Sequence, residues 1–181
     1  MKGIIIFASA MEDGEAITTR ALLKRAGLSL DSVVIRGDKT IQTAYQQVVV
    51  SDYQLSEINP LDYDFLVIPG GPYVGQTVDS DHTIKALAKS MYDAGKIVAA
   101  ICAGPRFLGQ ARLLDDKAFT CYPGSERDMP LGRYLADQKV VKDGQIITAR
   151  AAGSTVEFAA MITKTLLGDK AMNQLLASIY Y

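Results

Sequence analysis

Short apolar runs alternate along this chain with stretches whose apolar residues have helical spacing. The runs predict strands at residues 2–8, 32–36, 65–68, 96–102 and 118–122, because strands buried on both faces are continuously apolar. Helical spacing predicts helices that begin near residues 16, 84, 105, 155 and 170. This β-α-β order predicts an α/β fold in which helices cover both faces of a mostly parallel sheet.

Three further segments have local signals. Asp143-Gly144 predicts a hairpin turn between residues 139–142 and 145–148, and residues 45–51 look extended, in a hairpin with the chain near Thr40. Ser154 and Glu157 have the spacing of a helix capping box. Residues 123–138 are polar and irregular, which suits a loop over a site. No linker or repeat interrupts the pattern, so we expect one domain over residues 1–181.

Three candidate functional segments follow predicted strands. They are residues 9–15, Pro69-Gly70-Gly71 and Cys102. In folds of this class, sites lie beyond the carboxyl ends of the strands. We therefore expect these segments to meet in space although they come from different parts of the chain.

Cys102 ends an apolar run and is followed by small residues and a predicted helix. This pattern is typical of a strand-turn-helix elbow, which lifts one side chain above the sheet and points the next helix at it. Because a helix N-terminus favours a thiolate, Cys102 is predicted to lose its proton easily and to be nucleophilic or redox-active. The alternative is a buried residue that acts only as a small hydrophobe.

The glycine pair after the third run suggests a place where backbone approaches a ligand closely. The N–H groups of Gly71 and Ala103 are candidates for an oxyanion hole facing a carbonyl oxygen that Cys102 attacks. The alternative is that Gly70-Gly71 forms only a turn.

Glu15, at the start of the first helix, is the candidate carboxylate. If it points at Cys102, burial would raise its pKa and would let it donate a hydrogen bond or move a proton. Glu12 and Asp13 compete for this role, and spacing does not choose between the three. The alternative is an acidic side chain that only complements the helix dipole.

The other candidate residues give weaker evidence for a function. His82 is the only histidine and lies far along the chain from Cys102, so we expect no Cys–His dyad. Two cysteines and one distant histidine match no zinc spacing, so we expect no metal. Cys121 and Tyr122 should point to opposite faces of a strand, with Cys121 in the core; the alternative is that Cys121 resolves an oxidised Cys102.

The composition narrows the class of protein. Of 181 residues, 49% are apolar and 22% charged, as in globular chains, and the net charge is −1. The lack of a basic block argues against nucleic acid or an anionic membrane as partner. No run approaches the ~20 apolar residues that span a bilayer, and the first run is better explained as a strand than as a signal peptide. Two cysteines form no disulfide framework, which favours the reducing cytoplasm.

Several motifs together resemble the ThiJ/PfpI superfamily, specifically its DJ-one branch, over essentially the whole chain. They are Glu15 after the first strand, Val67-Ile68-Pro69-Gly70-Gly71, Ala99-Ala100-Ile101-Cys102-Ala103-Gly104-Pro105, Lys142-Asp143-Gly144 with Thr148-Ala149-Arg150, and Gly153-Ser154 before Glu157-Phe158-Ala159. The resemblance implies a flavodoxin-like, doubly wound α/β fold of the class I glutamine-amidotransferase type, usually a homodimer. It implies that Cys102 is the reactive cysteine, that Glu15 hydrogen-bonds to it, and that no cofactor is used. The substrate would meet Gly70, Gly71, Ala103, Tyr122 and Arg150.

The chain departs from the family pattern at a few positions. Tyr122 stands where many relatives have a histidine, which leaves Glu15, Tyr122 or water to move protons. Ala151-Ala152 replaces a Gly-Pro pair near Arg150, and Tyr45 stands where relatives often have arginine near the dimer-proximal site. Ala103 follows the cysteine where the protease-like branch has histidine, so peptidase activity is not expected.

The resemblance implies a stress-response protein that acts on small reactive aldehydes through Cys102, with glyoxalase or deglycase chemistry. A non-catalytic redox sensor or redox-regulated chaperone that works by oxidation of Cys102 is the first alternative. A hydrolase or hydratase acting on another small electrophile is the second.

Overall fold

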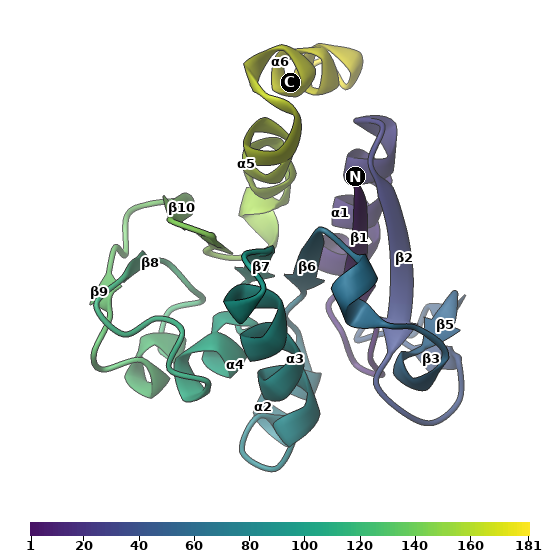
Figure 1. The fold of residues 1–181 in the computed structure, drawn as a ribbon, viewed down its shortest axis with the longest axis vertical. Coiled ribbons are helices and arrows are strands. Elements are labelled where there is room, and N and C mark those ends of the chain that lie inside the picture. The colour runs from purple at the N-terminus through teal and green to yellow at the C-terminus, as the bar shows by residue number, and fades with distance from the viewer.

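The computed structural model describes residues 1–181 and contains a central seven-stranded sheet with helices on both faces (Figure 1). The strand order is β10-β11-β7-β6-β1-β2-β5, and all neighbours are parallel except β10 and β11. The strands are β1 (Lys2–Ile6), β2 (Ser29–Val34), β5 (Tyr53–Gln54), β6 (Phe65–Ile68), β7 (Ile97–Ile101), β10 (Val140–Asp143) and β11 (Ile146–Ala149). The predicted fold class is confirmed, and so is the hairpin at Asp143-Gly144.

The helices form two layers. α1 (Asp13–Arg25) packs against α5 (Thr155–Leu167) on one face, and α6 (Asp169–Ser178) packs on α5 at the end of the molecule that carries the C-terminus (Figure 1). On the other face, α3 (His82–Asp93) and α4 (Pro105–Gln110) contact β7. The short α2 (Pro72–Thr77) follows β6 and was not predicted, because its six residues show no apolar period.

Two small sheets complete the fold. β3 (Thr40–Gln42) and β4 (Val48–Val50) form the expected hairpin. β8 (Ala118–Phe119) pairs in parallel with β9 (Arg133–Tyr134), so residues 123–138 are more regular than predicted and also contain a 3-10 helix, Ser125–Asp128. The strand predicted at 118–122 is wrong beyond residue 119, because the next residues leave the β8–β9 ladder and bond to the ends of β11 and β7 instead.

The capping box predicted before α5 is absent. The Ser154 side chain makes no capping hydrogen bond, and the Thr155 hydroxyl instead donates to the Ala152 carbonyl at 2.7 Å. The Glu157 carboxylate forms an ion pair with Lys139, the residue before β10. A partner far along the chain therefore takes the carboxylate that the local spacing assigned to the helix end.

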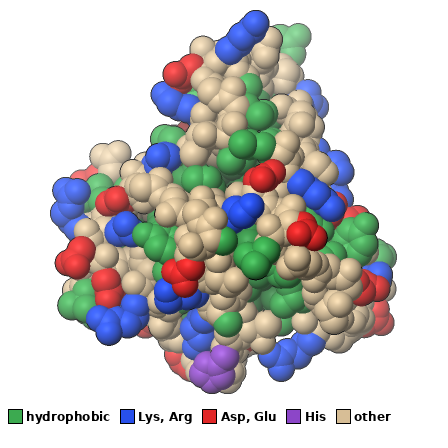
Figure 2. Space-filling view, viewed as in Figure 1, with side chains coloured by type: hydrophobic (Ala, Val, Ile, Leu, Met, Phe, Trp, Pro, Cys, Tyr) green, Lys and Arg blue, Asp and Glu red, His purple; other side chains and the backbone are tan.

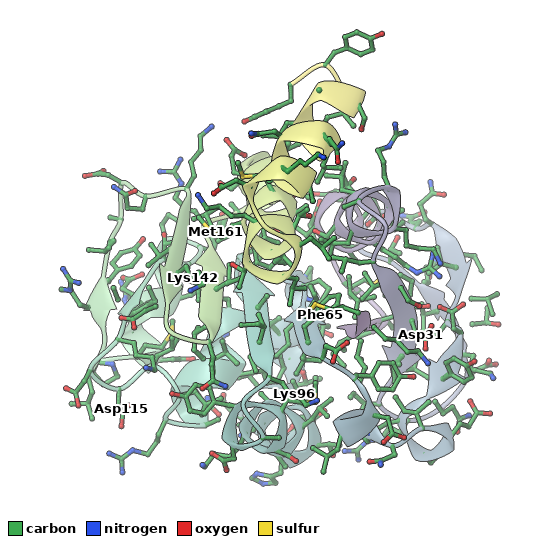
Figure 3. All side chains as sticks on the ribbon, turned by 45° about the horizontal axis from the view of Figure 1, so that its top comes forward. Asp31, Phe65, Lys96, Asp115, Lys142 and Met161 are labelled. Carbon is green, nitrogen blue, oxygen red and sulfur yellow. The ribbon has the colours of Figure 1, made fainter.

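The middle of the sheet, where β1 and β6 meet, is part of the hydrophobic core. Every residue of β6 is fully buried, as are Ile4, Ile5 and Ile6 of β1. Phe65, labelled in Figure 3, packs on Gly3 of β1. A Cβ atom on Gly3 would lie 2.2 Å from the Phe65 ring, so this ring fills the space that a side chain on Gly3 would occupy. This packing fixes β1 against β6, the two strands whose far ends lead to the candidate site.

The surface carries charges of both signs. Figure 2 shows Lys and Arg interspersed with Asp and Glu over the face it presents, without a basic field. None of the helices has the length and apolar character needed to cross a membrane.

Candidate active site

Three neighbouring strands, β1, β6 and β7, end at one edge of the sheet. Glu15 lies on α1 after β1, Gly70 follows β6, and Cys102 follows β7. The strand order reverses between β1 and β6, which is where ligands bind in doubly wound sheets. A Cβ atom on Gly70 would lie 2.6 Å from both the Cys102 Cβ and the Glu15 Oε2. The fold thus brings these residues together, and only glycine fits between the thiol and the carboxyl.

Cys102 has a left-handed backbone conformation with φ 63°, which is uncommon for a residue with a side chain and typical of a nucleophile elbow. Its N–H donates to the Ala149 carbonyl at 2.9 Å, and its carbonyl accepts from the Tyr122 N–H at 2.8 Å. These bonds hold a conformation that costs roughly 1–3 kcal/mol. The predicted elbow is present, and the thiol is only partly exposed.

The structure separates the three acidic candidates of α1. The Glu12 carboxylate caps the helix by accepting from the Glu15 N–H. Asp13 accepts from the Thr43 hydroxyl and, at 3.1 Å, from the Tyr45 N–H. Glu15 alone points inward and is 1% exposed. The carboxylate beside Cys102 is therefore Glu15.

Burial raises the pKa of Glu15 to about 7. A hydrogen bond with Cys102 and N–H donors of Gly70, at 2.9 Å, and Ala152 favour the carboxylate and oppose this shift, whereas the charge of Glu12 adds to it. The upward direction is the one predicted from the sequence. Glu15 is accordingly able both to hold and to release a proton near neutral pH.

The predicted easy ionisation of Cys102 is wrong. Burial, followed by the charge of Glu15 and its hydrogen bond, raises the pKa of the thiol well above its usual range. The Ala103 N–H does favour the thiolate, as expected of a turn that opens a helix, but it is outweighed. The helix itself is only the six residues of α4, so its dipole contributes little.

Glu15 and Cys102 consequently titrate as a pair. The first proton leaves near neutral pH, and the negative charge that remains makes loss of the second much harder. With one proton between them, the pair is a carboxylate beside a thiol or a carboxyl beside a thiolate. The second form presents a nucleophilic sulfur with a proton donor at its side.

The two proposed oxyanion donors are both free of backbone partners. The N–H groups of Gly71 and Ala103 donate to no carbonyl of the chain. Gly71 has φ 118°, and a Cβ there would lie 2.4 Å from the Glu12 nitrogen, so glycine is required at this turn. Gly70 differs from expectation, because its N–H is already committed to Glu15 and is not available to a substrate.

Tyr122 and Arg150 lie at the edge of the site. The Tyr122 side chain is 52% exposed, and the residue's hydrogen bond to Cys102 comes from its backbone N–H. The Arg150 guanidinium donates to the Ala136 carbonyl at 3.4 Å and lines a cavity of about 500 Å³ with Pro123, Gly124, Glu126, Tyr134, Ala136 and Ala151. Neither side chain hydrogen-bonds Cys102 or Glu15.

The remaining candidates lie outside the site. His82 is exposed at the start of α3, whereas Cys121 is fully buried in the core, as predicted. No cluster of three or more His, Cys, Asp or Glu side chains is arranged to hold a metal ion. The sequence did not reveal the Ala152 N–H as a partner of Glu15, because a backbone donor leaves no residue-type signal.

The fold and site together define a doubly wound α/β protein with a nucleophile-elbow cysteine and a buried carboxyl. The chain belongs to the DJ-1/PfpI family, whose model matches residues 1–165. It is 34% identical to a deglycase of Pyrococcus abyssi over 168 residues, covering 92% of this chain and 99% of the relative. It is 32% identical to a glutathione-independent glyoxalase of Caenorhabditis elegans over 169 residues, covering 91% and 88%. The crystal structure of Drosophila melanogaster DJ-1beta superposes with a TM-score of 0.91 at 27% identity, covering 99% and 97%.

The pH dependence of stability tests the burial of Glu15. Its pKa is raised from 4.5 to about 7 on folding, so the folded state binds this proton more tightly than the unfolded chain. The stabilisation is complete below about pH 4.5 and is lost as the pH rises through about 7, a change of about 3 kcal/mol. Relative to Glu15→Gln, the free energy of unfolding of the wild type should therefore fall by about this amount between pH 4 and pH 8 in urea titrations.

Glu157→Gln is the matched control. Burial opposes it, but Lys139 and Tyr181 hold the pKa of the Glu157 carboxyl below its usual value, so its contribution should have the opposite sign. A Glu15→Gln difference that is constant with pH would contradict the protonation argued above.

Proposed function

We propose that this protein converts small α-oxoaldehydes such as methylglyoxal into hydroxy acids such as lactate through Cys102, without a cofactor. The observation that carries the proposal is the pairing of Cys102 with a buried Glu15 that exchanges protons near neutral pH. This isomerisation needs a nucleophile and one group that both takes and returns a proton. The names of the glyoxalase and deglycase relatives support reactive carbonyls as the substrate class.

The first step is addition of the sulfur to the aldehyde carbon. As the C–S bond forms, the electron pair of the C=O bond moves to oxygen. The Gly71 N–H, which has no backbone acceptor, and the Ala103 N–H, which lies beside the Cys102 sulfur, are the proposed donors to that oxygen. The oxygen then takes the pair's proton to give a hemithioacetal. The proton therefore stays within the site, and Glu15 is left as the carboxylate that the next step requires.

The second step moves a hydrogen between carbons. Glu15 removes the proton from the sulfur-bearing carbon to give an enediolate and returns it to the neighbouring carbon, while the hydroxyl proton of the hemithioacetal passes to the former ketone oxygen. The product is a lactoyl thioester. Water then hydrolyses the thioester, releasing lactate and the Cys102 thiol. The sum is addition of one water, with no external oxidant or reductant.

No second side chain shares the proton transfers. Tyr122 occupies the position where many relatives have histidine, but its side chain is half exposed and makes no hydrogen bond to Glu15 or Cys102. Glu15 must then serve in both directions, as acid and as base. We accordingly expect slower turnover than in members that have the histidine.

Removal of the nucleophile should abolish lactate formation. Cys102→Ala is expected to reduce the rate to that of buffer, because no other thiol reaches the site, and Glu15→Gln should lower it by about 10²–10⁴-fold. Cys121→Ala is the matched control and should retain activity, since Cys121 is buried in the core. Equal rates of lactate formation for the wild type and Cys102→Ala would contradict the proposal.

A redox sensor is the second candidate. Both cysteines are free thiols, as suits the cytoplasmic location we propose. An oxidised Cys102 would lie beside the Ala103 N–H and a Glu15 carboxyl that is protonated below about pH 7. Both groups can donate to sulfinate oxygens.

Intact-mass measurement after mild peroxide tests this candidate. Two equivalents of peroxide transfer two oxygens to Cys102 and leave as water, so the wild type should gain about 32 Da. Cys121→Ala should gain the same mass, and Glu15→Gln should lose the selectivity for the sulfinate. An unreactive Cys102 would reject the sensor.

We also propose a homodimer through an exposed apolar patch of Ile17, Tyr45, Val48 and Val50. These side chains are 38–71% exposed. The Tyr45 N–H donates to Asp13, which ties the β3–β4 hairpin to the beginning of α1, where Ile17 lies. Large apolar residues gathered in this way favour a partner surface over solvent.

Charge placed in the patch should separate the protomers. Val48→Lys combined with Val50→Lys is expected to shift the sedimentation coefficient from dimer to monomer. Leu131 is 59% exposed and lies two residues before β9, which is on the other side of the molecule from β3 (Figure 1). Leu131→Lys should therefore leave the sedimentation coefficient unchanged. A wild-type protein that sediments as a monomer at micromolar concentration would reject the dimer.

A further inference from the structure

Tyr73, near the start of α2, is a buried tyrosine to which the chemistry above gives no role. Its side chain is 3% exposed, and its ring stacks on Phe107 of α4 with 6.1 Å between the centroids. The hydroxyl donates to the Pro69 carbonyl at 2.8 Å. A rigid ring therefore holds its hydroxyl against the turn that carries Gly70 and Gly71.

That carbonyl belongs to the same peptide unit as the Gly70 N–H. The N–H donates to the Glu15 Oε2 at 2.9 Å. Two hydrogen bonds thus run in series, from the Tyr73 hydroxyl to the Pro69 carbonyl, and from the Gly70 N–H to the Glu15 carboxyl. The whole series is buried.

We propose that Tyr73 is a positioning residue for the Glu15–Cys102 pair. Its hydroxyl acts through the Pro69–Gly70 peptide, where it orients and strengthens the Gly70 N–H that donates to Glu15. In this way Tyr73 controls how the pair holds its proton. The inference deepens the proposed function, on whose Cys102–Glu15 chemistry it rests. It requires no particular substrate.

The direction of the effect follows from amide polarisation. A donor on the carbonyl draws electron density from the peptide and makes its N–H a stronger donor, by roughly 10–30% per bond. A stronger N–H favours the carboxylate form of Glu15. Without the Tyr73 hydroxyl, the peptide also loses the contact that fixes its plane. The pair should then hold its first proton more tightly.

The other groups around the series stay in place when the hydroxyl is removed. Glu15 faces the Cys102 thiol, the Glu12 carboxylate and the Ala152 N–H as well as Gly70. The only further charge that acts on Tyr73 is that of Asp81, which caps α3. A change in the titration of the pair is therefore attributable to the missing hydroxyl.

The test is the pH dependence of Cys102 alkylation by iodoacetamide, followed by intact mass in a Cys121→Ala background. With Tyr73 in place, the rate of Cys102 alkylation should rise first with a midpoint near pH 7, where the pair loses its first proton. Tyr73→Phe should move this midpoint upward by about 0.3–0.5 pH unit. Circular dichroism establishes that the variant is folded.

Tyr63→Phe is the matched control. Tyr63 is also 3% exposed, and its hydroxyl donates to the Asp31 Oδ2 at 2.8 Å. It precedes β6 and so lies at the opposite edge of the sheet from Cys102, where β2 carries Asp31 (Figure 3). Both variants remove one buried hydroxyl, but only Tyr73→Phe should move the midpoint.

A second background isolates the path through Glu15. In Glu15→Gln, Cys102 titrates without its carboxyl partner, and adding Tyr73→Phe should leave the alkylation profile unchanged. A Tyr73→Phe midpoint equal to that of Tyr63→Phe, or one that moves downward, would overturn the inference. A wild type that forms no lactate but shows the upward shift would reject the proposed function while supporting the role of Tyr73.

Discussion

The burial of one carboxyl group against one thiol is the constraint on which the rest of the site depends. Glu15 is removed from water where β1, β6 and β7 end, and the lack of a side chain at Gly70 leaves room for its carboxyl beside Cys102. Buried ionisable groups are costly unless they are hydrogen-bonded. The N–H groups of Gly70 and Ala152 and the Cys102 thiol meet that need. Each comes from a different turn, so the site exists only when the whole edge of the sheet is assembled.

The strained backbone of Cys102 has the same dependence. A left-handed cysteine persists only where its surroundings over-determine it. Here the Cys102 N–H is held by Ala149 at the end of β11, and the Cys102 carbonyl is held by the Tyr122 N–H. The buried strands β6 and β7 support this turn. The packing of Phe65 on Gly3 belongs to this support, because it fixes β6 against β1. The support for the Cys102 turn therefore extends along the whole of β6, from Phe65 at its start to the Gly70 turn after its end.

The fold and the site's members were predictable from the sequence to different degrees. Apolar runs predicted β1, β6 and β7, because their burial on both faces leaves a local trace. Glu15 could be nominated but not chosen over Glu12 and Asp13, since Asp13 is held by a distant hairpin and the inward orientation of Glu15 depends on the assembled edge of the sheet. The state of Cys102 was predicted wrongly, because a helix N-terminus can be seen in the sequence whereas desolvation by the assembled edge cannot. The roles of Gly70 and Ala152 rest on backbone N–H groups, which have no residue signature.

A raised thiol pKa changes what the cysteine is suited to do. A thiolate stabilised by a cation or a long helix would be reactive at any physiological pH but would have no proton to deliver. In the proposed mechanism, the sulfur becomes nucleophilic as Glu15 takes its proton, so activation of the sulfur also prepares the acid. Addition to an aldehyde uses both at once, because the new alkoxide requires a proton as soon as the C–S bond forms. Peptide cleavage would also require delivery of a proton to a leaving amine, and no side chain other than Glu15 hydrogen-bonds the Cys102 thiol.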